Sequence, residues 1–184
     1  MNMATTTHLG FHFDDDATAP TTTVTLQKTM ALLMRLSIGW TFLYAGVNQV
    51  MNPGWTAVRF LGGAKSLKPM FEFFASPAVI PYVDFMVQWG HLMIGLALIT
   101  GICFRLSAGF GALLMIMYYL PRMDFPMVGA HNFIVEYHLV YAFLLIYLAS
   151  IKAGAIGGVQ DFVARIPWVA ALLDRYPRVL AWLT

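Results

Sequence analysis

The chain has 184 residues, of which 59% are apolar in type and only 11% are charged, and its mean hydropathy is +0.69. A soluble domain usually carries charge on about 25% of its residues, so this composition excludes an ordinary soluble enzyme, a disordered protein and a nucleic-acid binder. The formal net charge of +2 is too small to indicate an acidic partner. These values predict a one-domain integral membrane protein that is surrounded by membrane lipids.

The two ends of the chain differ from its middle. Residues 1–27 hold repeated threonines and an acidic run, without the basic start and apolar run of a secretory signal, so we expect a polar N-terminal extension. Residues 28–156 are expected to form the membrane domain, and residues 157–184 an amphipathic tail at the membrane interface. The single cysteine, Cys103, excludes an intramolecular disulfide and a cysteine-based metal cage, and we predict no metal site.

Four segments are long and apolar enough to cross a bilayer, which requires about 20 mostly apolar residues in a helix. They are residues 28–51, 81–102, 106–120 and 132–151. The connection between the first two, residues 52–80, mixes aromatic and charged side chains, which predicts one or two short helices at the interface. The sequence therefore predicts an all-α membrane protein, a four-helix transmembrane bundle with short interfacial helices after the first span and at the C-terminus.

An even number of spans places both ends of the chain on one side of the membrane. The basic residues of that side are Lys28, Arg105, Lys152, Arg165, Arg175 and Arg178, and those of the other side are Arg59, Lys65, Lys68 and Arg122. Because Lys and Arg are enriched on the cytoplasmic side, we expect both termini of this multi-pass protein in the cytoplasm.

Helical spacing divides the polar residues of the first span between two faces. One face holds Arg35, Gly39, Phe42, Gly46 and Gln49, and an almost opposite face holds Ser37, Thr41, Tyr44 and Asn48. Small and polar residues commonly hold membrane helices together, so packing is the simpler interpretation of both faces. For Arg35 the alternatives are a structural pair near the inner end and a contact to a bound anion or cofactor.

Histidines lie inside two later spans, where an ionisable side chain is costly and is therefore a functional candidate. One face of the second span holds Asp84, Gln88, His91 and Gly95. In the fourth span, Glu136 and Tyr147 share one face, and His138 and Tyr141 lie on another.

The two histidines are predicted at similar depths, with His91 about 16 Å and His138 about 20 Å from the inner ends of their helices. We predict that Gln88, His91 and His138 surround an apolar pocket, with Tyr141 as a further hydrogen-bond donor and Arg35 as another cofactor contact. A histidine exchanges a proton near neutral pH, which suits a quinone head group and makes His91 and His138 the candidate catalytic residues. The alternatives are axial ligation of a haem b iron by both histidines and two separate packing residues.

Three segments carry a recognisable pattern over residues 30–162. The first span contains LMRLSIGWTFLYAG from Leu33, the second continues as WGHLMIGLALITGICFRLSA from Trp89, and the fourth is followed by Ala-Gly and then by GVQD from Gly158. In this order the segments resemble the DoxX/DoxD family, in which a polar residue precedes a glycine-rich apolar helix that ends in Gly, a short turn and Arg. Many relatives have Glu where this chain has His91, so no carboxylate-based role is carried over.

The resemblance implies a membrane protein of redox metabolism in a prokaryotic cell membrane. DoxD-like members are described as the membrane subunit of a thiosulfate:quinone oxidoreductase. The expected activity is therefore electron transfer from a small donor, thiosulfate by resemblance, to membrane quinone, with Arg59, Lys65 and Lys68 attracting an anionic donor. The alternative is a non-catalytic accessory subunit of a larger respiratory or photosynthetic complex, in which other membrane subunits contact the second polar face of the first span.

Overall fold

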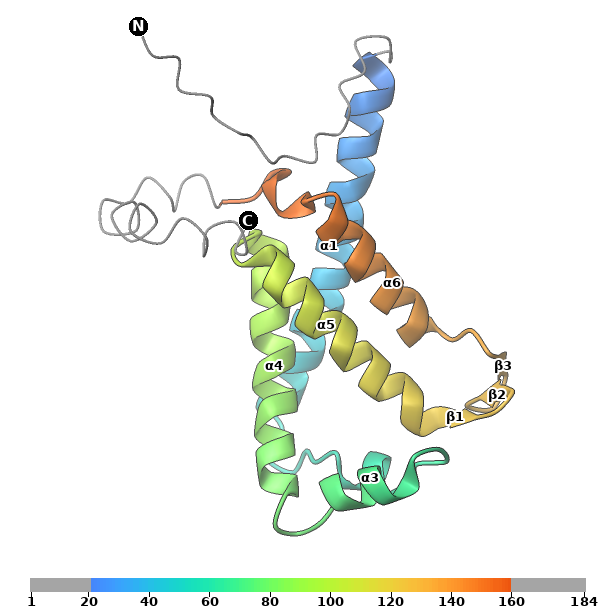
Figure 1. The fold of residues 1–184 in the computed structure, drawn as a ribbon. Coiled ribbons are helices and arrows are strands. Elements are labelled where there is room, and N and C mark those ends of the chain that lie inside the picture. The colour runs from blue at the N-terminus through green and yellow to red at the C-terminus, as the bar shows by residue number, and fades with distance from the viewer. Residues whose placement is uncertain (1–20, 160–184) are drawn as a thin grey trace, which may run out of the picture.

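The computed structural model describes residues 21–159, which fold into a helical bundle with an irregular end (Figure 1). The helices are α1 (Thr21–Val50), α2 (Val58–Gly62), α3 (Lys68–Phe74), α4 (Ile80–Thr100), α5 (Phe104–Tyr119) and α6 (Tyr137–Ser150), with 3-10 turns η1 (Leu120–Arg122) and η2 (Ala153–Ala155). Three short strands form an antiparallel sheet in chain order, namely β1 (Met123–Asp124), β2 (Met127–Val128) and β3 (Asn132–Phe133). Most of the predicted extension and of the predicted tail lies outside the described residues.

Three helices are long and apolar enough to cross a membrane, over Thr22–Val50, Ile80–Thr100 and Phe104–Arg122. This confirms the all-α membrane class. The first helix begins before the predicted residue 28, and its 30 residues correspond to about 45 Å of helix. Because the hydrocarbon core of a bilayer is about 30 Å thick, α1 extends past the other helices, as Figure 1 shows.

The predicted fourth span, residues 132–151, is wrong at its start. Asn132 pairs with Val128 in the sheet, and the helix begins only at Tyr137, after the extended N-cap residue Glu136. The resulting α6 has 14 residues, about 21 Å, which is shorter than a full crossing requires. A count of four complete spans is therefore not confirmed.

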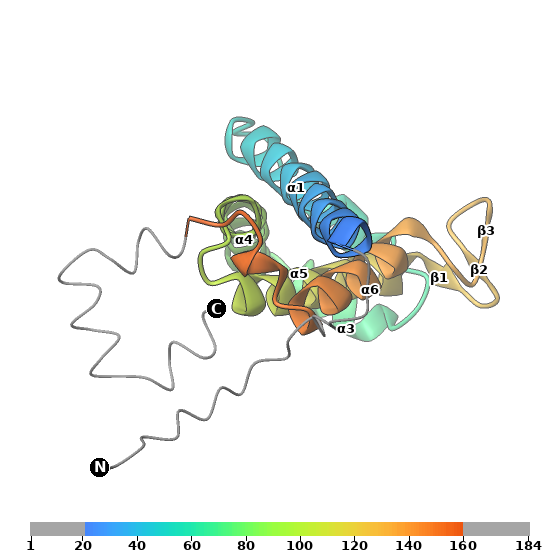
Figure 2. The same cartoon turned by 90° about the horizontal axis from the view of Figure 1, so that it is seen from above.

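The bundle consists of two helix pairs, α1 with α4 and α5 with α6, whose members pack more extensively than α4 packs on α5. A Cβ atom on Gly46 would collide with the backbone of Leu92, and one on Gly95 with the backbone of Leu43. The two glycines therefore allow α1 and α4 to approach closely. Seen from above, α1 lies on one side of the molecule beside α4 (Figure 2).

The short helices after α1 close the end of the bundle that is remote from the start of α1. Their buried residues, Leu61 and Phe71 among them, pack with Trp55, Val83 and Leu120. Asp84 Oδ1 accepts a hydrogen bond from the Ala57 backbone N–H at 2.8 Å, so α4 holds this segment directly. The prediction of one or two short helices in residues 52–80 is confirmed.

Candidate functional site

A buried carboxylate marks the beginning of α6. Glu136 is only 2% exposed, and its Oε2 accepts hydrogen bonds from the His138 backbone N–H at 3.1 Å and from His138 Nδ1 at 2.6 Å. Its Oε1 lies 3.6 Å from Arg122 Nη2. The same side chain thus caps the helix and pairs with both a histidine and an arginine.

Tyr118 of α5 lies between the two predicted histidines. Its ring is stacked on His138 with 5.5 Å between centroids and a 7° interplanar angle, and its centroid is 5.6 Å from that of His91. Because His91 is near the middle of α4 and His138 is in the first turn of α6, α6 begins at about half the height of α4. His91 and His138 are thereby brought together as predicted, with a tyrosine ring between them.

The hydrogen bonds of the two imidazoles define their tautomers. His91 Nδ1 lies 2.8 Å from the Val87 carbonyl oxygen, which can only accept, so Nδ1 carries the proton. His138 Nδ1 faces the Glu136 carboxylate and is protonated for the same reason. In both neutral rings Nε2 is therefore the acceptor nitrogen, the arrangement in which a histidine can take up a proton.

Gln49 adds an amide to this group, because its side chain reaches Tyr118. Its Oε1 is buried and accepts no hydrogen bond within residues 21–159. A buried polar atom normally has a partner, so this oxygen is available to a bound group. We refer to Gln49, His91, Tyr118, Arg122, Glu136 and His138 as the polar cluster.

An apolar groove of about 890 Å³ runs between α4 and α5, and Tyr118 lines it. The groove extends from Phe60 and Phe71 at the α2–α3 end to Cys103 and Ser107 at the start of α5. Gly90 belongs to its wall, and a Cβ atom added there would meet nothing within 4 Å. Tyr118 is therefore the residue through which the groove meets the polar cluster.

Two other predicted site residues lie beside the cluster. Tyr141 contacts Tyr137 edge-on at 5.8 Å, and Tyr137 packs on His138 at 4.1 Å, so Tyr141 is separated from His138 by one ring. Gln88 is half-buried one turn before His91, and the described part of the chain gives it no side-chain hydrogen bond to the cluster.

Arg35 is placed at the opposite end of the bundle and serves a structural purpose. It is fully buried, and its guanidinium donates to the carbonyl oxygens of Ala153 at 2.8 Å, Gly154 at 3.0 Å and Ile156 at 2.8 Å. A longer contact of 3.5 Å reaches the Ile99 carbonyl near the end of α4. Since its donors face backbone carbonyls about 12 Å along α4 from His91, Arg35 does not join the predicted pocket.

Sequence reasoning missed four members of the cluster, namely Gln49, Tyr118, Arg122 and Glu136. Glu136 was assigned to a helix face with Tyr147, because the helix was assumed to begin at residue 132. Glu136 and His138 are two positions apart, which separates them within a helix but joins them when the first is the N-cap.

The sequence was also compared with family models, curated proteins and solved structures. The model of the DoxX family matches residues 30–120. Through this region the chain belongs to the DoxX family. No curated protein and no solved structure matches the chain.

The DoxX match covers α1 to α5 and includes Gln49, His91 and Tyr118 of the polar cluster. It ends before Arg122, Glu136 and His138. The half of the cluster that supplies the Glu136–His138 pair is thus contributed by the chain after the matched DoxX region.

Proposed function

We propose that this DoxX protein binds a membrane quinone, with the head group at the polar cluster and the isoprenoid tail in the apolar groove. The observation that carries this proposal is the position of Tyr118, whose side chain lines the apolar groove and also contacts the histidines of the polar cluster. A pocket with long apolar walls and a few convergent polar groups at one end has the form that an amphipathic ligand requires.

The polar atoms of the cluster match the oxygen atoms of a quinone in its two redox forms. The unpartnered Gln49 Oε1 and the acceptor Nε2 atoms of neutral histidines can accept from the hydroxyl groups of a quinol. When protonated at Nε2, the same histidines donate to the carbonyl oxygens of a quinone. A haem b fits less well, because the Tyr118 ring lies between the two imidazoles.

Proton transfer is the chemistry that the chain's own residues supply. A bound quinone takes up or releases two electrons and two protons. Glu136 fixes Nδ1 of His138 and stabilises the imidazolium that forms when Nε2 gains a proton. Arg122 is partly exposed and ion-paired to Glu136, so it connects this carboxylate with the surface of the protein.

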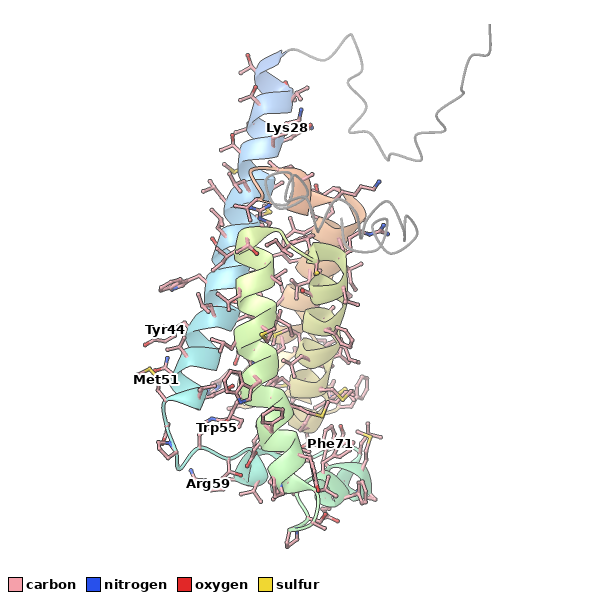
Figure 3. All side chains as sticks on the ribbon, turned by 90° about the vertical axis from the view of Figure 1, so that its left-hand side faces the viewer. Lys28, Tyr44, Met51, Trp55, Arg59 and Phe71 are labelled. Carbon is pink, nitrogen blue, oxygen red and sulfur yellow. The ribbon has the colours of Figure 1, made fainter. Side chains whose placement is uncertain are left out.

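The electron donor is proposed from the DoxD resemblance to be thiosulfate. Arg59 and Lys68 are exposed at the α2–α3 end, and Figure 3 shows Arg59 directed outward. Arg35 has no part in this proposal, because it is buried and donates to backbone carbonyl groups. A donor anion is therefore proposed to approach the end that α2 and α3 close.

The test fills the groove without disturbing the helix contacts. Gly90→Leu places a side chain in the groove, where the added Cβ meets no neighbour. The purified variant in quinone-free nanodiscs is expected to retain about tenfold less decylubiquinone than the wild type, because an overfilled apolar site costs about 1–3 kcal/mol. Bound quinone is measured by extraction and absorbance after gel filtration.

Gly109→Leu is the matched control. Gly109 is also a helical glycine with nothing within 4 Å of an added Cβ, but it does not line the groove, so this variant should bind decylubiquinone normally. Tail-free ubiquinone-0 should bind Gly90→Leu and wild type about equally. Unchanged decylubiquinone binding by Gly90→Leu would show that the groove does not hold the tail.

A second candidate function is that of an accessory subunit in a larger membrane complex. The observation in its favour is the first part of α1, which extends beyond the other helices (Figure 1) and exposes Leu26 and Leu33 at 58% and 50%. Solubilisation of native membranes in a mild detergent distinguishes the two proposed functions. An accessory subunit migrates with its complex and lacks quinone binding of its own.

A further inference from the structure

An outward-facing stripe of α1 repeats with the spacing of a two-helix interface. Its residues are Met30, Met34, Ser37, Thr41, Tyr44 and Asn48, which we name the outer seam. Steps of four and three residues alternate along it, as at the a and d positions of a left-handed helix pair. Every member is exposed, including Met30 at 40%, Met34 at 42% and Tyr44 at 62%.

The outer seam faces away from every other helix of the described chain. Figure 3 shows Tyr44 directed away from α4, and Met51, seven residues further and just after the end of α1, points the same way. The bundle instead contacts the opposite face of α1, which includes the buried Arg35, Ile38 and Phe42. The interior of the protein therefore does not account for the repeat.

The polar part of the outer seam lies at the depth of the membrane-spanning helices. Gly39 faces Leu98 and Gly46 faces Leu92, so the stretch from Ser37 to Asn48 runs alongside α4. Thr41 Oγ1 and Asn48 Nδ2 donate to backbone carbonyls four residues earlier, at 3.0 Å and 2.8 Å. The Asn48 amide retains its second N–H and its oxygen, and lipid tails offer neither a donor nor an acceptor.

We propose that the outer seam is the contact between two copies of this chain, which pair through parallel α1 helices about a two-fold axis along the membrane normal. In such a contact each residue meets its own copy, so Asn48 bonds Asn48 and the small Ser37 and Thr41 allow close approach. The seam carries no charged residue, so the pairing of identical helices brings no like charges together. An asparagine at an a position is also the residue that favours a two-helix pair.

Cysteine cross-linking tests the pairing. In a Cys103→Ser background, Thr41→Cys is expected to give a disulfide-linked dimer in native membranes treated with copper phenanthroline. Leu36→Cys is the control, because Leu36 is also exposed on α1, at 37%, but lies on a different face. The dimer band from Thr41→Cys should exceed that from Leu36→Cys by about tenfold.

A second measurement does not depend on an added cysteine. Asn48→Leu should weaken dimerisation in detergent by about tenfold, because interhelical polar contacts in membranes contribute about 1–2 kcal/mol. Equal cross-linking at Thr41 and Leu36, or a wild-type protein that is monomeric in nanodiscs and in mild detergent, would overturn the proposal. A cross-link from Thr41→Cys to a different protein would overturn it as well, and would assign the seam to a foreign helix.

Discussion

Tyr118 is the residue on which the proposed quinone site depends, because it connects two different environments. On one side its ring contacts His91 and His138, and on the other it lines the apolar groove. A residue in this position separates the polar chemistry of the histidines from the apolar space while contacting both. The proposed roles of the histidines can therefore be tested apart from the groove.

Replacement of either histidine by phenylalanine is expected to lower quinone binding. His91→Phe and His138→Phe keep a flat ring against Tyr118 but remove the Nε2 acceptor, whose hydrogen bond contributes about 1 kcal/mol, or roughly fivefold in affinity. Quinone reduction should fall further, since proton transfer typically contributes about a hundredfold or more. Bound decylubiquinone and donor-dependent quinone reduction are the two measurements.

The control for the histidine variants is His131→Phe, because His131 is exposed in the loop before α6 and lies outside the cluster. It should behave as the wild type. If His91→Phe and His138→Phe bind and reduce quinone at the wild-type level while remaining folded, both histidines are packing residues.

Sequence reasoning could identify His91 and His138 because an ionisable residue in an apolar segment stands out. It could not identify Tyr118, since a tyrosine in an apolar helix has no such contrast with its neighbours. Gln49 was placed on the same face of the first span as Arg35, but only the crossing of α1 over α4 shows that its amide reaches Tyr118. The site was thus predictable where the chemistry was local.

At the level of elements, Arg35 connects α1 with α4 and with the chain after α6. It lies on α1, its guanidinium bonds the chain after α6 through Ala153 and Ile156, and it reaches Ile99 on α4. A positive charge beside free carbonyl groups at a helix end is favourable. The contacts of Arg35 therefore agree with the structural alternative, in which its charge holds helix ends together.

Arg35→Met should strongly destabilise the bundle. It leaves several buried carbonyl oxygens without donors, and each buried acceptor that loses its hydrogen bond costs about 1–3 kcal/mol. Thermal unfolding in detergent, followed by circular dichroism, should show a clear decrease in Tm. The Tm of Arg35→Lys should lie between those of the wild type and Arg35→Met. Its ammonium group keeps the charge but cannot reproduce the planar fork of a guanidinium.

Lys28→Met is the control for charge removal on the same helix, since Lys28 is exposed and Figure 3 shows it beyond the bundle. It should unfold at the wild-type temperature. If Arg35→Met unfolded at the same temperature as Lys28→Met, the carbonyl contacts of Arg35 would contribute little to stability.

The start of α6 was the element that the sequence predicted least well. Apolar composition alone extends the segment back to residue 132, but Asn132 and Phe133 pair with β2, and the Glu136 carboxylate satisfies an N–H group of the first turn. The helix α4 was predicted within two residues of both its ends, because Pro81 and Gly101 bound it. Strand pairing and capping determine where the shorter helix α6 begins, and neither leaves a strong local pattern in the sequence.

For the whole molecule, the basic residues fall into two groups at opposite ends of the bundle. Lys28, Arg105 and Lys152 lie at the end where α1 starts and α6 finishes, as Figure 1 shows for these elements. At the other end, the Lys65 side chain is paired with Asp124 at 3.4 Å, and the Lys65 backbone N–H bonds the Pro121 carbonyl at 2.8 Å. Counted over the whole sequence, six basic residues are assigned to the side of the first group and four to the other side, and this excess is the charge polarity of the chain.

This polarity predicts that the start of α1 and the end of α6 face the cytoplasm and that α2 and α3 face outward. In a Cys103→Ser background, Lys68→Cys should react with a membrane-impermeant maleimide added to intact cells, while Lys28→Cys should react only after the membrane is opened. Both side chains are exposed, so access to the reagent depends on the side of the membrane rather than on burial. The reverse labelling pattern would place α2 and α3 in the cytoplasm. It would also place the proposed approach of the donor anion on the cytoplasmic side.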